Sequence, residues 1–278
     1  MGREIEKTMT KTVESNHDVE KVALFELIYQ LADDDFIHAY RGSEWLGLAP
    51  HIEEDVAFSS INQDTMGHAT MLYELLSELG EGEANDLAHG RSVKERRNAV
   101  LLELVNGPGT YLEEPRYDWA FTVARNFYYT SWKKAKIESL KQSSYQPLAH
   151  IAVKINMELS YHYLHWKTWI IQLFNASEDS RDRMIEASDR VHQEFADVMS
   201  LGPMEAKMVS LGFISTQHEL WKRWTYLVEP VFQAINLHLP KHFSAQGGQG
   251  RMQEHTSDLA SALETLSEVY ELDRTASW

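Results

Sequence analysis

Apolar residues recur at three- and four-residue steps along most of the chain, which is the period of an amphipathic α-helix. The first such segment spans about 18–45, and its period is set by Val22, Phe25, Ile28, Tyr29, Ala32, Phe36 and Ala39. No alternating apolar and polar run is long enough to predict a β-strand. The pattern therefore predicts an all-α protein.

Glycine and proline positions divide this periodic pattern into helices and connections. The long helices are expected at about 18–45, 53–79, 117–142 and 147–174. Shorter helices are expected at 178–200, at 217–237 with a kink or break before Pro230, and at 257–272. The segment 93–105 should be helical or partly extended, and the loops are expected at 80–92, 106–109 and 244–256.

Four long helices joined as two hairpins predict a four-helix bundle of the ferritin-like type, with additional helices. The polar residues 1–17 are expected to form a flexible N-terminus. The rest of the chain, 18–278, is long enough for one large domain and is predicted to be a single ferritin-like helical domain.

Charge and cysteine content narrow the classes of function. The 42 acidic residues outnumber the 26 basic ones, and an acidic chain is a poor default partner for nucleic acid. There are no cysteines, which excludes disulfides, thiolate metal sites and cysteine nucleophiles. The first residues contain no apolar signal-peptide core, and no stretch approaches a membrane span, so a cytoplasmic location without a membrane partner is predicted.

A histidine in the second helix of each predicted hairpin carries the candidate chemistry. These residues are His68 and His162, and each follows an acid by four residues, Asp64 and Glu158 respectively. Residues four apart share a helix face. Di-iron carboxylate bundles place Glu-x-x-His on two helices and a single Glu on each of the other two. The histidine spacing therefore raises the question of a metal site.

The acids that such a site needs are incomplete. Thr65 and Leu159 stand three residues before the two histidines, and neither is a good iron ligand. The third long helix has no acid over 126–132, whereas Glu44 on the first helix could supply a single carboxylate. The five candidate ligands are Glu44, Asp64, His68, Glu158 and His162. The simpler interpretation is a buried polar cluster whose members pair with one another and hold no metal.

Four stretches of the chain resemble a known family. They are "SEWLGLAPHIEEDVAFSSINQDTMGHA" (43–69), "FTVARNFYYTSWKKAKIESL" (121–140), "AVKINMELSYHYLHWKTWIIQL" (152–173) and "GGQGRMQEHTSDLASALETLSEVYELDRTASW" (247–278). They resemble the PaaC family, the structural subunits of the phenylacetyl-CoA epoxidase multicomponent monooxygenase. The last stretch is the most specific, because its HT-x-x-L pattern and terminal Trp separate PaaC proteins from the catalytic PaaA proteins.

The resemblance implies a ferritin-like scaffold whose iron site has been dismantled. The catalytic relatives have motifs similar to QDExGH and EExxH, in which the metal-binding acid lies three residues before the histidine. The matching positions here are Thr65, Leu159 and, on the third helix, Thr130. His68 departs from the family pattern, where Gln is common. The resemblance thus implies no catalytic, cofactor or metal residue, only a vestigial polar region of Glu44, Asp64, Thr65, His68, Thr130, Glu158, Leu159 and His162.

The same resemblance implies a non-catalytic subunit that pairs with a PaaA-like catalytic subunit and with the other subunits of the complex. The complex epoxidises the ring of phenylacetyl-CoA with dioxygen and electrons from a reductase, and the di-iron centre is expected in the partner. Two alternatives stay open: an oxygenase in its own right that uses a displaced carboxylate and histidine site, and a free-standing acyl-CoA-binding protein. The isolated chain could also form a homo-oligomer.

Overall fold

The computed structural model describes the backbone of residues 2–110 and 112–276, and within these ranges the side chains from residue 18 onwards. The regular elements of this described part are helices, with one isolated β-bridge between Thr110 and Glu113. The prediction of an all-α protein is therefore confirmed. The expected flexible segment 1–17 lies outside the residues whose side chains are described.

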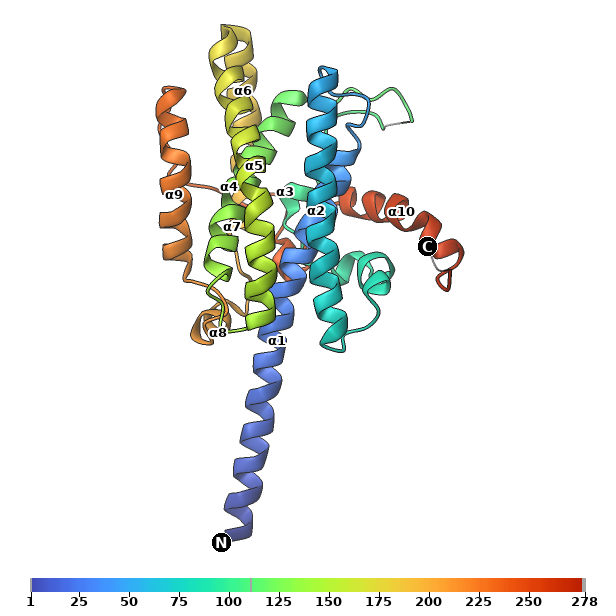
Figure 1. Ribbon diagram of the computed structural model, residues 1–278, viewed down its shortest axis with the longest axis vertical. Coiled ribbons are helices and arrows are strands. Elements are labelled where there is room, and N and C mark those ends of the chain that lie inside the picture. The colour runs from blue at the N-terminus through green and yellow to red at the C-terminus, as the bar shows by residue number, and fades with distance from the viewer. Residues whose placement is uncertain (1, 111, 277–278) are drawn as a thin grey trace.

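Four long helices form the bundle. They are α1 (Gly2–Ser43), α2 (Ile52–Glu78), α4 (Trp119–Leu140) and α5 (Gln146–Ala176). Helix α1 packs along α2, and α4 packs along α5, so the bundle consists of two helical hairpins (Figure 1). Helices α2 and α5 run in opposite directions and also pack against each other. This is the predicted four-helix arrangement.

The remaining helices are shorter. They are α3 (Val100–Glu103), α6 (Glu178–His192), α7 (Phe195–Met199), α8 (Glu205–Ser210), α9 (Gln217–Ala234) and α10 (Ser257–Leu272). Single turns occur at η1 (Asp86–Gly90), η2 (Val93–Glu95) and η3 (Gly250–Met252). Helices α6 and α9 pack against the outer side of α4.

This arrangement encloses α4 and leaves α5 open on one side. In α4, 18 of the 22 residues are buried, because helices contact it from both the bundle and the outer layer. In α5, nine of the 31 residues are buried, and they recur at three- and four-residue steps. Helix α4 therefore lies almost entirely in the interior of the molecule, whereas α5 leaves a broad face exposed.

Side-chain caps explain where several helices begin. Asp118 accepts a hydrogen bond from the backbone N–H of Phe121 at the start of α4. Ser177 caps α6 in the same way, and Thr216 forms a reciprocal capping box with Glu219 at the start of α9. Such caps satisfy backbone donors that have no partner within the helix.

Three details differ from the expectations. The helix expected at 178–200 is divided between α6 and α7, because Glu194 leaves the helix and accepts hydrogen bonds from the N–H of Gly247. Helix α9 continues through Pro230, which lies on its exposed side, where water can bind the carbonyl that proline leaves unpaired. Helix α8 was not predicted.

Three consecutive aspartates on α1 tie the bundle to the irregular segments. All three are buried, and each is directed to a different partner. Asp33 pairs with Arg91, Asp34 with Arg251, and Asp35 with Lys133. A buried carboxylate needs such a partner to offset its desolvation. The first two pairs fix the 91–99 segment and the glycine-rich 247–252 loop against α1, and the third joins α1 to α4.

The glycine-rich loop is held by carboxylates. The N–H of Gly250 donates to Asp197 over 3.0 Å, and the N–H of Gly247 donates to Glu194. Because these amides already have internal acceptors, the loop does not offer the free N–H groups of a phosphate-binding loop. The glycines of this segment therefore serve close packing of the backbone.

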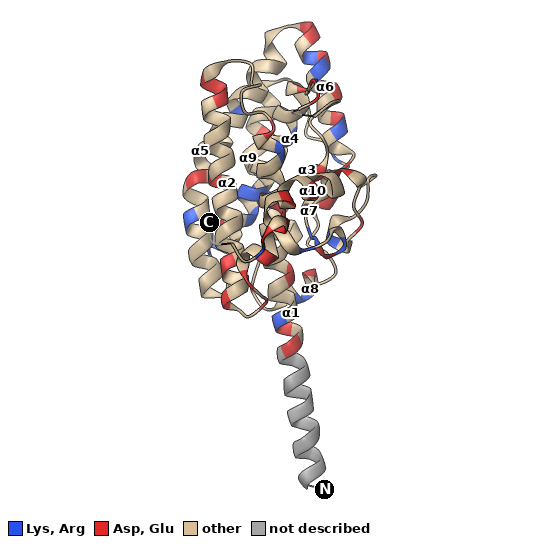
Figure 2. Ribbon diagram, turned by 90° about the vertical axis from the view of Figure 1, so that its right-hand side faces the viewer, with Lys and Arg blue, Asp and Glu red and all other residues tan. Residues whose placement is uncertain are grey.

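Charge is distributed over many helices. Acidic and basic positions are mixed along the helices in the view of Figure 2. Across the part of the chain that the structure describes, no helix combines the length and the apolar character that a membrane crossing requires.

Candidate functional site

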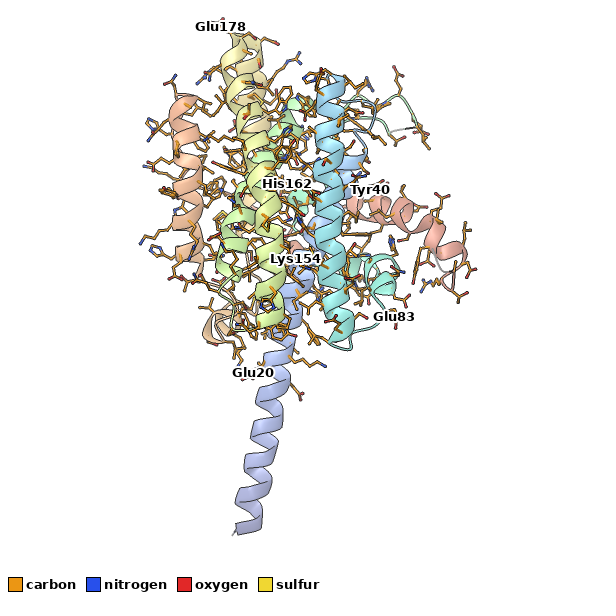
Figure 3. All side chains as sticks on the ribbon, in the orientation of Figure 1. Glu20, Tyr40, Glu83, Lys154, His162 and Glu178 are labelled. Carbon is orange, nitrogen blue, oxygen red and sulfur yellow. The ribbon has the colours of Figure 1, made fainter. Side chains whose placement is uncertain are left out.

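The two histidines and the two acids singled out above form crossed pairs between α2 and α5. His68 Nε2 lies 2.6 Å from Glu158 Oε2, and His162 Nε2 lies 3.0 Å from Asp64 Oδ2. Figure 3 labels His162 near the middle of α5. Because the two helices are antiparallel, each acid reaches the histidine of the opposite helix instead of the one four residues along its own.

Lys133 on α4 occupies the interior side of this group. Its Nζ lies 2.9 Å from His68 Nδ1 and 2.7 Å from Asp35 Oδ1. The hydroxyl of Tyr129 also donates to Asp35 Oδ1, over 2.8 Å. A chain of hydrogen bonds therefore runs from α4 and α1 through Lys133 and His68 to Glu158 on α5. We call Asp35, Asp64, Lys133, Glu158, His68 and His162 the central polar cluster.

The partners of His68 define its tautomer. A lysine ammonium has only donors, so His68 Nδ1 must accept from Lys133, and Nε2 carries the proton donated to Glu158. Burial lowers the pKa of His68 far below its ordinary value, and the positive charge of Lys133 lowers it further. His68 is therefore a neutral imidazole that relays between a cation and a carboxylate.

The other members of the cluster are perturbed for related reasons. Burial lowers the pKa of His162 to about 4. The hydrogen bond and the negative charge of Asp64 act in the opposite direction and raise this pKa. Burial raises the pKa of Asp35, and the Lys133 ammonium opposes this rise. Burial, followed by the negative charge of Asp64, raises the pKa of Glu158. Two neutral histidines and one ammonium thus lie among three carboxyl groups.

The positions that would carry iron-binding acids hold other chemistry. The Thr65 hydroxyl donates to the backbone carbonyl of Ile61 over 2.7 Å. Leu159 is buried in the hydrophobic core, and Thr130 is buried on α4. Neither Thr65, whose hydroxyl is bonded within its own helix, nor the aliphatic Leu159 supplies a carboxylate to the cluster.

Glu44 lies in a different environment from the one predicted. It pairs with Arg41 over 2.9 Å and accepts a hydrogen bond from Asn106 over 2.7 Å. These contacts hold the C-terminal end of α1 against the loop that follows α3. The structure therefore corrects the prediction that Glu44 supplies a carboxylate beside the two histidines.

The donor set does not fit a di-iron centre. Both ring nitrogens of His68 are engaged, by Glu158 and by Lys133. The ammonium inside the cluster would repel a bound cation. Among residues 18–110 and 112–276, no group of three or more histidine, aspartate and glutamate side chains is arranged to hold a metal ion.

Sequence reasoning missed Lys133 and Asp35. A signal was present, because Lys133 follows Thr130 by three residues on a helix that is otherwise rich in apolar and aromatic residues. A charge on the expected buried face of a helix needs a partner. The run Asp33–Asp35, inside the amphipathic first helix, offered that partner.

A groove of about 600 Å³ opens beside Glu44. It is lined by Tyr40, Arg41, Ser43, Glu44, Leu46, Val105, Asn106, Gly109, Thr110, Leu112, Tyr117, Ser261 and Thr265. Arg41 supplies a guanidinium to this lining, and that group is already bonded to Glu44 and to the carbonyls of Glu103 and Asp258. The groove is therefore poorly equipped for the phosphates of a CoA ligand.

The fold and the central polar cluster define a ferritin-like helical-bundle protein with a lysine among the side chains that face one another inside the bundle. The family model of the phenylacetic acid catabolic proteins, PaaA_PaaC, matches residues 8–278, and the chain belongs to this family. It is similar to the C subunit of 1,2-phenylacetyl-CoA epoxidase from Escherichia coli (strain K12). The two are 26% identical over 243 residues, which cover 86% of this chain and 94% of the relative. The predicted resemblance to PaaC proteins is confirmed.

Proposed function

We propose that this chain is the non-catalytic structural subunit of a phenylacetyl-CoA epoxidase complex that serves aerobic phenylacetate catabolism in the cytoplasm. It would pair with a PaaA-like subunit that carries the di-iron centre, and it would associate with the other subunits of the complex. The family membership and the similarity to the C subunit of an epoxidase support this assignment.

The observation that carries the proposal is the position of Lys133. Its ammonium lies between Asp35 and His68 in the interior of the bundle. A buried carboxylate and imidazole require a cation or donors to offset their desolvation, and Lys133 provides both. These contacts pair the carboxylate of Asp35 and the imidazole of His68 with a side chain of the chain itself, which supports a scaffold role.

The oxygenase alternative demands a different arrangement. Asp64 and Glu158 would have to turn from the opposite histidines to a shared metal, and Lys133 would have to leave His68. Each change breaks a hydrogen bond made to a buried side chain, which is costly. The existing contacts favour the scaffold assignment.

The test measures iron in the chain purified alone after growth with added iron. We expect far less than one iron per chain, while the PaaA-family subunit from the same genome, prepared in parallel, carries its di-iron centre. Close to two irons per chain, lost on His68→Ala and His162→Ala substitution, would establish the oxygenase alternative instead.

A second measurement tests the pairing directly. The chain is co-expressed with the PaaA-family subunit of the same genome, with an affinity tag on one of the two. Equimolar co-purification is expected, and its failure would refute the proposed function. Titration of the isolated chain with CoA addresses the acyl-CoA-binding alternative, for which saturable binding would be required.

A further inference from the structure

The outer face formed by α2 and α5 exposes an apolar stripe along α5. In Figure 1, these two helices lie at the front of the bundle, and no other helix crosses them. The exposed large apolar side chains of this face are Val153, Met157, Tyr161 and Leu164 on α5, and Ile52 and Val56 on α2. The α5 residues are spaced four, four and three apart, which places them on one side of the helix.

The face is large enough for a stable interface. Helix α5 has 31 residues, which corresponds to a length of roughly 45 Å. Two helices side by side span roughly 20 Å, so the face covers on the order of 900 Å². A standard specific interface takes about 800 Å² from each partner. One apolar residue, Met157, is 75% exposed and would be covered by such a contact.

Two carboxylates lie within the apolar stripe. The side chains of Glu158 and Asp64 are 47% and 34% exposed, and Glu158 directly follows Met157. Each acid is hydrogen-bonded to a buried imidazole, Glu158 to His68 and Asp64 to His162, and a neutral imidazole supplies no counter-charge.

The neighbouring cations lie elsewhere in the cluster or at its edge. Lys133 faces the group from α4 and is paired with Asp35 of α1. Lys134, also on α4, donates to the Ser160 hydroxyl. Lys154 is exposed one turn before Glu158 on α5 (Figure 3). The middle of the face therefore presents two acids beside exposed apolar side chains, with Lys154 one turn away on α5.

This charge pattern selects the occupant. A second copy of this chain, related by a twofold axis through the middle of the face, would bring its own Asp64 and Glu158 against the same acids. Like charges opposed in a desolvated contact disfavour association. A different partner with an apolar helical surface and a central Lys or Arg would instead gain a charge-assisted contact.

We propose that the α2–α5 face is the surface on which the catalytic subunit docks, with a basic side chain of that subunit meeting Asp64 and Glu158. The inference rests on the proposed function and adds the location and the chemistry of the contact. The hydrogen-bond chain through His68 and Lys133 then joins the interface to the interior of the bundle.

The experiment uses matched tyrosines on two faces. Tyr161 on α5 lies in the stripe, whereas Tyr226 on α9 is 82% exposed on a different helix. Affinity for the PaaA-family subunit of the same genome is measured for Tyr161→Lys and Tyr226→Lys by calorimetry. Tyr161→Lys should weaken binding by about thirtyfold or more, the effect of a central interface residue. Tyr226→Lys should bind as the unsubstituted chain does.

A second pair tests the charge. Glu158→Gln keeps an acceptor for the Nε2–H of His68 but removes the negative charge, and Glu186→Gln makes the same change on the exposed surface of α6. Glu158→Gln should weaken binding by roughly tenfold at low salt and reduce its salt dependence. Glu186→Gln should change neither.

Each outcome decides between the two proposals. If the unsubstituted chain binds and Tyr161→Lys and Glu158→Gln bind equally well, the docking face is elsewhere, while the proposed function stands. If the unsubstituted chain does not bind the catalytic subunit, the proposed function itself fails. Light scattering on the isolated chain completes the test: a homodimer that Tyr161→Lys converts to monomer would assign the face to a second copy and overturn the inference.

Discussion

The ammonium of Lys133 donates a hydrogen bond to Nδ1 of His68 over 2.9 Å, and this contact joins two helices from different hairpins of the bundle. It fixes the imidazole as a neutral acceptor on one side and a donor to Glu158 on the other. The hydrophobic interior of the bundle is thereby interrupted by a group of paired polar side chains that reaches the partly exposed Glu158.

Replacing Lys133 with Met should destabilise the protein by about 3–5 kcal/mol, because Asp35 would remain buried without its cation. Urea unfolding followed by circular dichroism measures the change. The double variant Lys133→Met with Asp35→Asn should recover a large part of the loss, since it removes both charges. A loss below about 1 kcal/mol in the single variant would show that the pair contributes little.

Stability should fall as the pH is lowered from about 6.5 to about 4, partly because of His162. Its pKa is about 4 in the folded protein, against an ordinary value of 6.5. Below pH 6.5, the unfolded chain therefore binds a proton that the folded chain does not, which favours unfolding as the pH decreases. The groups that face it are Asp64, which opposes this effect, and Lys133 and His165, which strengthen it.

The comparison of His162→Gln with His218→Gln isolates this contribution. Unfolding free energies are measured between pH 7 and 4 for each variant. The His162→Gln variant should lose less stability than the unsubstituted chain over this range, by on the order of 3 kcal/mol. His218 is exposed on α9, and its substitution should leave the slope unchanged. Equal slopes for all three proteins would contradict the assignment of His162 as a neutral buried group.

Two glycine-to-alanine substitutions should have opposite effects. A Cβ at Gly250 would lie 1.9 Å from the backbone oxygen of Asn98, whereas a Cβ at Gly67 would meet no heavy atom within 4 Å. Gly250→Ala should therefore destabilise by about 3 kcal/mol or more. Gly67→Ala, inside α2, should stabilise by about 0.5–1 kcal/mol. Thermal unfolding of the two variants checks both signs, and a neutral Gly250→Ala would show that the loop adjusts freely.

Glu54 ties the start of α2 to the last turns of α5. It accepts hydrogen bonds from Trp169 Nε1 over 2.6 Å and from His165 Nε2 over 2.9 Å. Glu54→Leu should cost about 2 kcal/mol, because two donors lose their acceptor. Thermal unfolding and tryptophan fluorescence report the loss. The neighbouring exposed Glu53, substituted in the same way, should change stability by less than about 0.5 kcal/mol.

The helices could be predicted from the sequence wherever apolar residues recur clearly with the helical period. Helix α10 begins and ends where the pattern predicted, and the four bundle helices agree with their expected ranges except at the start of α1. The division between α6 and α7 was missed, because Glu194 turns away to bind the amide of Gly247, which is distant in the sequence. A contact of this kind leaves no trace in local periodicity.

The candidate site was predicted in part. The sequence identified His68, His162 and their acids, but helical spacing alone paired each histidine with the acid on its own helix. The crossed pairing depends on the antiparallel register of α2 and α5, which no local pattern encodes. Lys133 was missed for a similar reason, because the burial of an ammonium is acceptable only once Asp35 is brought to it by tertiary packing.

The positive charge at the centre of this bundle is covalently attached to the polypeptide. A metal-dependent bundle must acquire its ion after synthesis, and its folded population then depends on the concentration of that ion. Lys133 belongs to the same polypeptide as Asp35, so every synthesised chain contains both charges. If the chain has the non-catalytic role proposed above, its folding should therefore be insensitive to iron starvation.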